Sequence, residues 1–249
     1  DSDDLFFGDC VNEIYETAEK NNVDILQMPF MFFRDGKDGP YKSDSAFEYG
    51  KVIGHKEIMK YIVRSSSDRS VIFAWRNIYK RAFLIDNNIS FDSSLRMLED
   101  PPFNTLAFLK AERFMAADIP GYSYRVRQDS LQRKKYIENY DAVMERQWEL
   151  KQKYYKDYSD GNVLFYKDIA EFTIKTNLPT LLSNLYLNSV DGKYKILKRI
   201  GNLPMIRKSF EDYDINEFKS KSIDWWATFF IKKKLYPLAH IICKKVLYK

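Results

Sequence analysis

The sequence is poor in the residues that build zinc sites and disulfide frameworks. Among 249 residues there are 2 Cys and 2 His, with 9 Gly and 8 Pro. Cys10 and Cys243 form no Cys-x-x-Cys pair, and His55 and His240 are scattered, so no zinc framework is expected. We expect each thiol to be buried, in a protein from a reducing compartment. So little Gly and Pro also excludes collagen-like and low-complexity architectures.

Long apolar runs are lacking as well. A helix that spans a membrane needs roughly 18 apolar residues, whereas the uncharged stretch 177–190 is interrupted by Asn, Ser and Thr. The chain opens with Asp-Ser-Asp-Asp instead of a signal peptide, so we expect a cytoplasmic protein. Crowded carboxylates repel one another, and the first residue is not Met. Residue 1 is therefore expected to be a cut point inside a longer protein.

The composition predicts a globular protein whose charge is unevenly distributed. Hydrophobic residues make up 45% and charged residues 30%, enough for a sizeable core. The net charge is +5, but residues 225–249 hold six Lys and no acid, which leaves 34 basic and 35 acidic side chains in residues 1–224. Because basic and aromatic residues are not interleaved through the body, we expect no nucleic-acid partner.

The spacing of apolar residues predicts a mixed first half and a helical second half. Helices are expected over 5–22, 52–63, 78–86 and 102–115, and strands over 23–33, 71–75, 89–91 and 122–127. From residue 132 the chain is charged, aromatic and poor in Gly, and helices are expected over 132–158, 166–176, 180–187 and 225–234. The predicted fold class is α/β followed by an α-helical C-terminal extension.

Two acidic clusters are candidates for chemistry. Asp1, Asp3 and Asp4 form an Asp-x-Asp-Asp motif, and carboxylates on such a loop bind hard cations such as Mg²⁺ or Mn²⁺. The alternative is an exposed acidic cap on the following helix. Glu99 and Asp100 stand before two prolines, where they either cap a helix or provide a general base.

The order of several short motifs is more informative than either cluster. After the first acidic cluster come Asp24-Ile25-Leu26, then Trp75, Tyr79, Lys80, Arg81 and Leu84, then Asn88-Ile89-Ser90-Phe91, then Glu99, Asp100 and Phe103, and last Tyr122, Tyr124, Arg125, Arg127 and Ser130. In this order the motifs resemble family 2 glycosyltransferases, the GT-A fold enzymes of bacterial polysaccharide synthesis. The resemblance covers residues 1–131 and implies the downstream part of a Rossmann-like GT-A catalytic domain, on the metal and acceptor side. The upstream half that binds the nucleotide base is expected before residue 1. Residues 132–249 are then a helical extension with a basic aromatic tail, 225–249.

The resemblance implies an inverting transfer of a sugar from a nucleotide-diphosphate donor to the hydroxyl of a glycan or a lipid-linked glycan. Asp3 and Asp1 would hold the Mg²⁺ or Mn²⁺, while Asp1, Asp4, Arg125 and Arg127 would face the donor. Asp100 would be the general base, and Glu99 would be a second catalytic residue that hydrogen-bonds the acceptor or tunes Asp100. Trp75 would stack on the acceptor, although a Trp that ends an apolar strand is also a common core residue. Arg125 and Arg127 could equally be surface charges on a strand.

Two other classes compete with this interpretation. A phosphatase of the haloacid dehalogenase type also uses Asp-x-Asp, but Leu5 stands where that class needs Thr or Val. A non-catalytic membrane-surface or scaffold module is suggested by the tail, where Trp225, Trp226, Phe229 and Phe230 precede the lysines at 232–234. Such a tail fits a helix on an anionic bilayer, at the inner face of the cell membrane. The alternative is a C-terminal helix docked on the core with solvated lysines.

Overall fold

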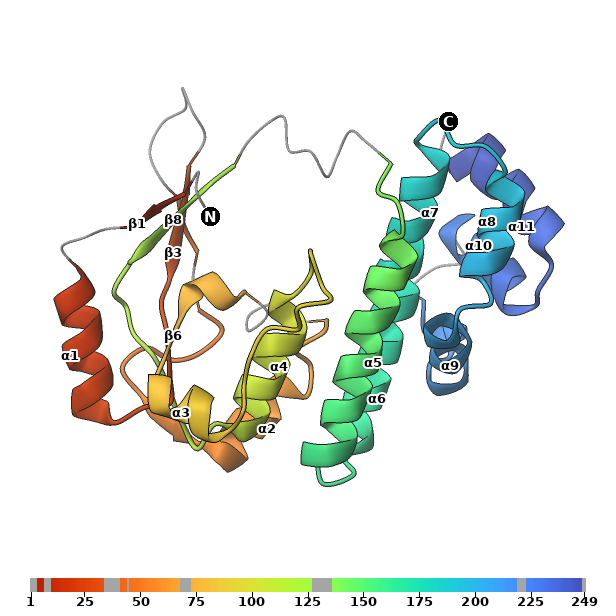
Figure 1. Ribbon diagram of the computed structural model, residues 1–249. Helices are drawn as coiled ribbons and strands as arrows, with labels where there is room; N and C mark the ends of the chain where they lie inside the picture. The colour runs from red at the N-terminus through yellow and green to blue at the C-terminus, as the bar shows by residue number, and fades with distance from the viewer. Residues whose placement is uncertain are drawn as a thin grey trace. The chain divides into compact units, whose positions relative to one another are not determined.

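A computed structural model gives the fold of residues 4–6, 10–33, 41–43, 45–67, 73–126, 136–218 and 223–247. The chain divides into two units, Asp1–Ser130 and Leu131–Lys249. Figure 1 shows strands and helices together in the first unit and helices in the second. The predicted order, α/β followed by helices, is confirmed.

The first unit contains two short mixed sheets. One is ordered β1-β8-β3-β4, from Leu5–Phe6, Tyr122–Arg125, Phe30–Phe33 and Tyr41–Ser43. The other is ordered β5-β7-β2-β6, from Val52–Gly54, Arg113–Ala116, Ile25–Gln27 and Asn77–Tyr79. Each sheet has one parallel pair, β3 with β8 and β2 with β7, flanked by antiparallel strands.

Four helices of the first unit connect or cover these strands (Figure 1): α1 (Val11–Asn21), α2 (His55–Ile62), α3 (Arg81–Asp86) and α4 (Asp100–Lys110). Ile14 of α1 packs with Cys10, Leu26, Met28 and Met115 in one buried cluster. Gly121 lies so close to it that a Cβ there would stand 2.8 Å from the Met28 sulfur. Cys10 and Cys243 are both buried thiols, as expected.

Asp24, which follows α1, is hydrogen-bonded to the start of β7. Its carboxylate accepts the backbone N–H groups of Glu112 and Arg113, at 2.8 and 2.9 Å. The Arg113 guanidinium returns to the carbonyls of Asn22 and Asn21. These contacts start β7 at Arg113, so the helix predicted over 102–115 ends at Lys110 instead.

Other element predictions in the first unit need correction. Leu5–Phe6 is a strand paired with β8, so the first helix begins at Val11 and not at residue 5. The single strand expected over 23–33 is two strands in different sheets. The break falls at Met28 and Pro29, where the Met28 N–H donates to the Arg76 carbonyl and the Arg76 side chain donates to the Met28 carbonyl. The helix expected over 52–63 starts with β5, and no strand forms over 89–91.

The second unit consists of packed helices, as predicted. In order along the chain these are α5 (Tyr140–Tyr158), α6 (Val163–Phe172), a π-helical turn (Thr173–Asn177), α7 (Leu178–Tyr186), α8 (Lys193–Ile200), α9 (Pro204–Asp212), a 3₁₀ turn (Ile215–Glu217), α10 (Ile223–Lys232), α11 (Tyr236–Ile242) and a second π-helical turn (Cys243–Leu247). Within the described parts of the chain, no helix is long and apolar enough to cross a membrane.

Arg207 of α9 holds the end of α10 in place. Its guanidinium donates to the carbonyls of Ile231 and Lys232, at 2.8 and 3.0 Å, and to that of Gly201. It also donates to the Tyr236 hydroxyl at the start of α11. The last carbonyls of a helix lack partners within the helix, so this one side chain satisfies two of them and fixes the turn between α10 and α11.

Candidate functional site

Trp75 lies at the centre of an aromatic cluster in the first unit. It belongs to a 3₁₀ turn, Ala74–Arg76, and not to the strand expected over 71–75, of which residues 71 and 72 lie outside the described residues. Its ring stacks on those of Tyr122 (4.8 Å, 22°) and Tyr124 (5.7 Å, 16°), with Phe30 edge-on at 4.7 Å. Tyr124 remains 38% exposed, whereas Tyr122 is buried. The indole is therefore half-buried, with an exposed aromatic ring parallel to it.

Asp4 is joined to this cluster through β8. The Tyr122 hydroxyl donates to one carboxylate oxygen of Asp4 at 2.5 Å, and the Arg125 backbone N–H donates to the other at 2.8 Å. The Arg125 guanidinium lies over the Phe33 ring, 4.9 Å from its centroid. Both oxygens of Asp4 are thus engaged by groups of the protein, and Asp4 ties the residues around β1 to β8.

Asp100 is linked to the aromatic cluster from a different element, helix α4. It is the first residue of α4, and its Oδ2 accepts the N–H of Ala74, next to Trp75, at 3.1 Å. Partial burial raises the pKa of the Asp100 carboxyl, and the negative charge of Glu99 adds to this, while the Ala74 hydrogen bond opposes it. Glu99 precedes the helix and is half-buried. A carboxyl with a raised pKa is a stronger base than an ordinary carboxyl, which suits it to accept a proton.

A buried polar network supports the helix that carries Asp100. Ser45, Gln27 and Asn77 are linked by side-chain hydrogen bonds of 3.0 and 3.2 Å. The amide of Asn77 then donates to the Tyr79 hydroxyl, which donates to Asn104, one turn after Asp100. Burial raises the pKa of Tyr79 well above its usual range, so the phenol stays protonated and keeps donating. The network fixes α4 against β2 and β6.

The structure therefore brings Asp4, Trp75, Asp100 and the Arg125 backbone into one connected cluster, with Glu99 next to Asp100. Asp1, Asp3 and Arg127 lie outside the described residues. In the part of the chain that is described, no three His, Cys, Asp or Glu side chains are grouped as metal ligands. The sequence analysis assigned no role to Tyr122 and Tyr124. Both belong to the last motif, and their spacing of two residues is the signal that places them on one face of a strand.

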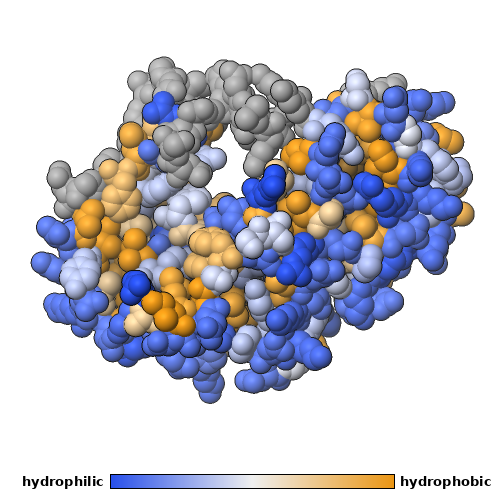
Figure 2. Space-filling model, in the orientation of Figure 1, coloured by the Kyte–Doolittle hydropathy of each residue, from blue (hydrophilic) through white to orange (hydrophobic). Residues whose placement is uncertain are grey.

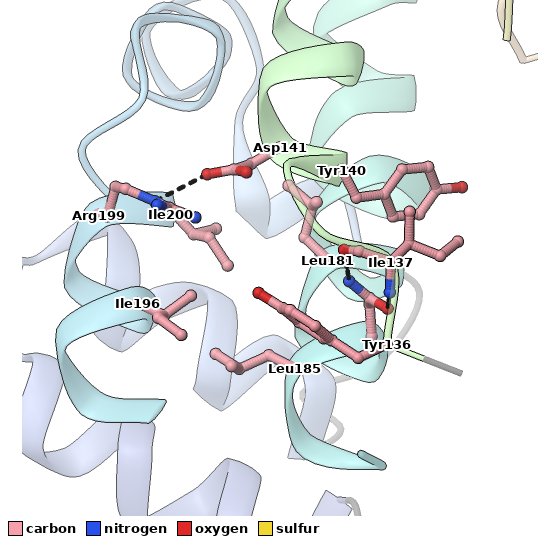
Figure 3. Close-up of a pocket in the computed structure, with 10 residues that line it drawn as sticks. Tyr136, Ile137, Tyr140, Asp141, Leu181, Leu185, Ile196, Arg199 and Ile200 are labelled. Atoms are coloured by element: carbon pink, nitrogen blue, oxygen red, sulfur yellow. Dashed lines mark hydrogen bonds and ion pairs between the residues drawn. The ribbon is translucent and has the colours of Figure 1, made fainter. Parts of the chain in front are cut away.

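A pocket in the second unit contains none of the predicted site residues. Figure 3 shows Leu181, Leu185, Ile196 and Ile200 around it, with the ion pair between Arg199 and Asp141 at one side. That pair is 2.9 Å long. Asn184, which also lines the pocket, exchanges two 2.9 Å hydrogen bonds with the backbone of Ile137. The lining mixes apolar with polar side chains, and Arg199, Asp141 and Asn184 are already paired within the protein.

Comparisons with known proteins point to one general class. No protein-family model matches the chain. Over 211 residues the chain is 27% identical to EpsJ of Bacillus subtilis (strain 168), an uncharacterized glycosyltransferase, and this match covers 84% of the chain and 60% of EpsJ.

Solved structures of S. aureus TarS 1–349 share the fold. The complex with UDP-GlcNAc matches at a TM-score of 0.58 and 15% identity, covering 98% of this chain and 65% of that one. The complex with UDP matches at 0.55 and 14% identity, covering 98% and 64%. The chain thus spans 60% to 65% of the lengths of these relatives. The likeness to EpsJ, together with this fold, supports the resemblance to glycosyltransferases as a general class.

Proposed function

We propose that the chain is the metal and acceptor side of an inverting family 2 glycosyltransferase with a GT-A fold, which acts in surface polysaccharide synthesis. The observation that carries this proposal is the connected cluster of Asp4, Trp75 and Asp100, which come from three different motif blocks. The likeness to EpsJ supports the general activity. The UDP-GlcNAc bound by TarS supports a nucleotide-sugar donor.

In this proposal Asp100 is the general base. Its half-buried carboxylate takes the proton of the acceptor hydroxyl while that oxygen attacks the anomeric carbon of the donor sugar. The new glycosidic bond forms as the bond to the diphosphate breaks on the opposite face, so the anomeric centre inverts. This single displacement needs no nucleophile from the protein. The raised pKa predicts that activity falls on acidification at a higher pH than for an ordinary carboxyl group.

The donor side rests on Asp1, Asp3, Arg125 and Arg127. Asp3 and Asp1 would hold Mg²⁺ or Mn²⁺, which when bound stabilises negative charge on a leaving diphosphate. Because both oxygens of Asp4 accept hydrogen bonds from β8, we assign Asp4 the role of positioning this segment rather than that of a direct ligand. The paired rings of Trp75 and Tyr124 provide a flat surface on which an acceptor sugar can stack.

Release of UDP from UDP-GlcNAc, with and without Mn²⁺, tests the proposal. We expect Asp100→Asn to lower turnover by about 10²- to 10⁴-fold, the usual contribution of a general base, while donor affinity measured by calorimetry stays nearly unchanged. Asp86→Asn, at an exposed position at the end of α3, is the matched control. Equal loss of turnover and donor affinity in Asp100→Asn would contradict the base assignment. Absence of donor binding by a protein that spans the full length of EpsJ, of which this chain covers 60%, would instead favour a non-catalytic scaffold module.

A further inference from the structure

The C-terminal tail carries apolar side chains that the helical core leaves exposed. On α10, Trp226 is 41% exposed and its ring contacts the half-buried rings of Phe229 and Phe230. On α11 and the turn before it, Leu235, Leu238 and Ile241 are 44%, 44% and 49% exposed. Figure 2 shows hydrophobic residues among hydrophilic ones on the visible surface of the second unit.

The packing of the unit relies more on other residues of these helices than on the exposed ones. The opposite side of the same two helices is buried through Trp225, Ile231, Tyr236 and Ala239. The Trp225 indole also donates to the Ile215 carbonyl at 2.9 Å. Arg207 fixes the turn between the helices. The tail therefore keeps its outer apolar side chains in place on a well-anchored pair of helices.

Four lysines lie close in sequence to these apolar side chains, and the residues after Asp224 include no acid. Lys233 and Lys234 stand in the turn between α10 and α11, and Lys244 and Lys245 follow α11; all four are exposed. The nearest acid along the chain is Asp224, at the start of α10, and none follows it. We call Trp226, Leu238 and Ile241 with these four lysines the tail face.

We propose that the tail face docks on a bilayer that contains anionic phospholipids. Aromatic and aliphatic side chains of an amphipathic helix enter the region between headgroups and acyl chains, while lysines remain with the lipid phosphates. A cluster of lysines near an anionic leaflet adds an electrostatic attraction. A protein partner would need an apolar groove lined with acids, whereas an anionic bilayer offers both properties at once. This inference does not rest on the proposed sugar transfer.

Vesicle flotation of the 249-residue chain tests the tail face directly. The vesicles are phosphatidylcholine alone or phosphatidylcholine with one-third phosphatidylglycerol, at low and high salt. We expect binding to the anionic vesicles that weakens with salt, and little binding to the neutral ones. Neither donor nor acceptor is needed, so a failure here is distinguishable from a failure of the proposed function.

Two sets of variants separate charge from apolar contact. Changing Lys233, Lys234, Lys244 and Lys245 to Gln should lower the partition coefficient at least about 100-fold, because each lysine contributes about five-fold near an anionic surface. The control changes Lys20, Lys56, Lys60 and Lys156 to Gln, which removes the same charge from exposed helix positions elsewhere.

Replacing Trp226 and Ile241 by Ser should lower partition by about ten-fold or more. Its control replaces Tyr15 and Val11, which are 63% and 47% exposed on α1. Circular dichroism verifies that each variant is folded.

Several results would overturn the proposal. These are absence of binding by the parent chain, equal binding to neutral vesicles, or equal loss in the tail variants and their controls. Self-association that depends on Trp226 and Ile241, in a chain that does not bind vesicles, would show that the tail face contacts a second copy instead.

Discussion

Replacing Tyr122 by Phe isolates one contact in the candidate site. The substitution keeps the ring that stacks on Trp75 at 4.8 Å and removes only the hydroxyl, which donates to Asp4 at 2.5 Å. Asp4 keeps its second hydrogen bond, from the Arg125 backbone at 2.8 Å. The two strands β1 and β8 pair through two residues each, so this side-chain contact is a large part of what joins them.

The size of the effect follows from the charge and burial of the pair. A hydrogen bond to a charged group contributes roughly 1.5 to 3 kcal/mol to stability. Tyr122 is buried but Asp4 is half-exposed, so water partly replaces the lost bond. We therefore expect Tyr122→Phe to lower the free energy of unfolding by about 1 to 2 kcal/mol, and to speed hydrogen exchange at the amides of β8.

Urea unfolding and hydrogen exchange of four proteins measure this contact: the parent, Tyr122→Phe, Asp4→Asn and the double variant. The two changes should be coupled by about 1 kcal/mol or more, because both remove one interaction. Tyr124→Phe is the control, since it lies two residues away in the same strand and its ring also stacks on Trp75. The anchoring role of Asp4 is wrong if Tyr122→Phe lowers the free energy of unfolding no more than Tyr124→Phe does. It is also wrong if Tyr122→Phe lowers that free energy equally in the parent and in the Asp4→Asn variant.

Three further changes test packing and charge, each by urea unfolding. Arg207→Ala should destabilise the second unit by about 2 to 4 kcal/mol through lost hydrogen bonds to carbonyls, whereas Lys208→Ala, at an exposed ion pair, should cost less than about 1 kcal/mol. Gly121→Ala should cost about 1 to 3 kcal/mol by overpacking against Met28. Burial lowers the pKa of Lys151 from 10.5 to about 8. The unfolded chain therefore binds more protons between these values, and stability should rise with pH across that window by roughly 3 kcal/mol, a rise that Lys151→Met abolishes.

The helical half was predictable because its signals are local. Apolar spacing and the absence of Gly and Pro predicted helices near α6, α7 and α10, and the observed ends differ by a few residues. The sequence of α10 shows that this helix is apolar on most of its circumference. It does not indicate that Trp225 is buried while Trp226 is exposed, because that depends on where Ile215 and Arg207 stand.

The first half was harder to predict because distant residues decide its boundaries. The sequence from Pro102 to Met115 reads as one helix, but Asp24, 88 residues before Glu112, captures the amides that start β7. Trp75 reads as the end of a strand, yet the N–H of Ala74 is taken by the Asp100 carboxylate and the chain turns there. In both cases a backbone N–H donates to a carboxylate that is distant in sequence instead of to another backbone group. Local propensity cannot predict such a contact.

The same property gives the candidate site its physical basis. The motif blocks that suggested sugar transfer are separated by up to 118 residues, and the contacts between them pass through Tyr122 and the backbone of Ala74. Asp100 faces a turn whose position depends on the stacking of Trp75, and Trp75 depends on the strand that Asp4 anchors. A change at Asp4 should therefore alter the surroundings of Asp100 without touching it. An acid that only caps a helix would have no such effect, so the pH dependence of activity in Asp4→Asn separates the two interpretations: a shifted acidic limb indicates a connected site, and an unchanged limb indicates independent acids.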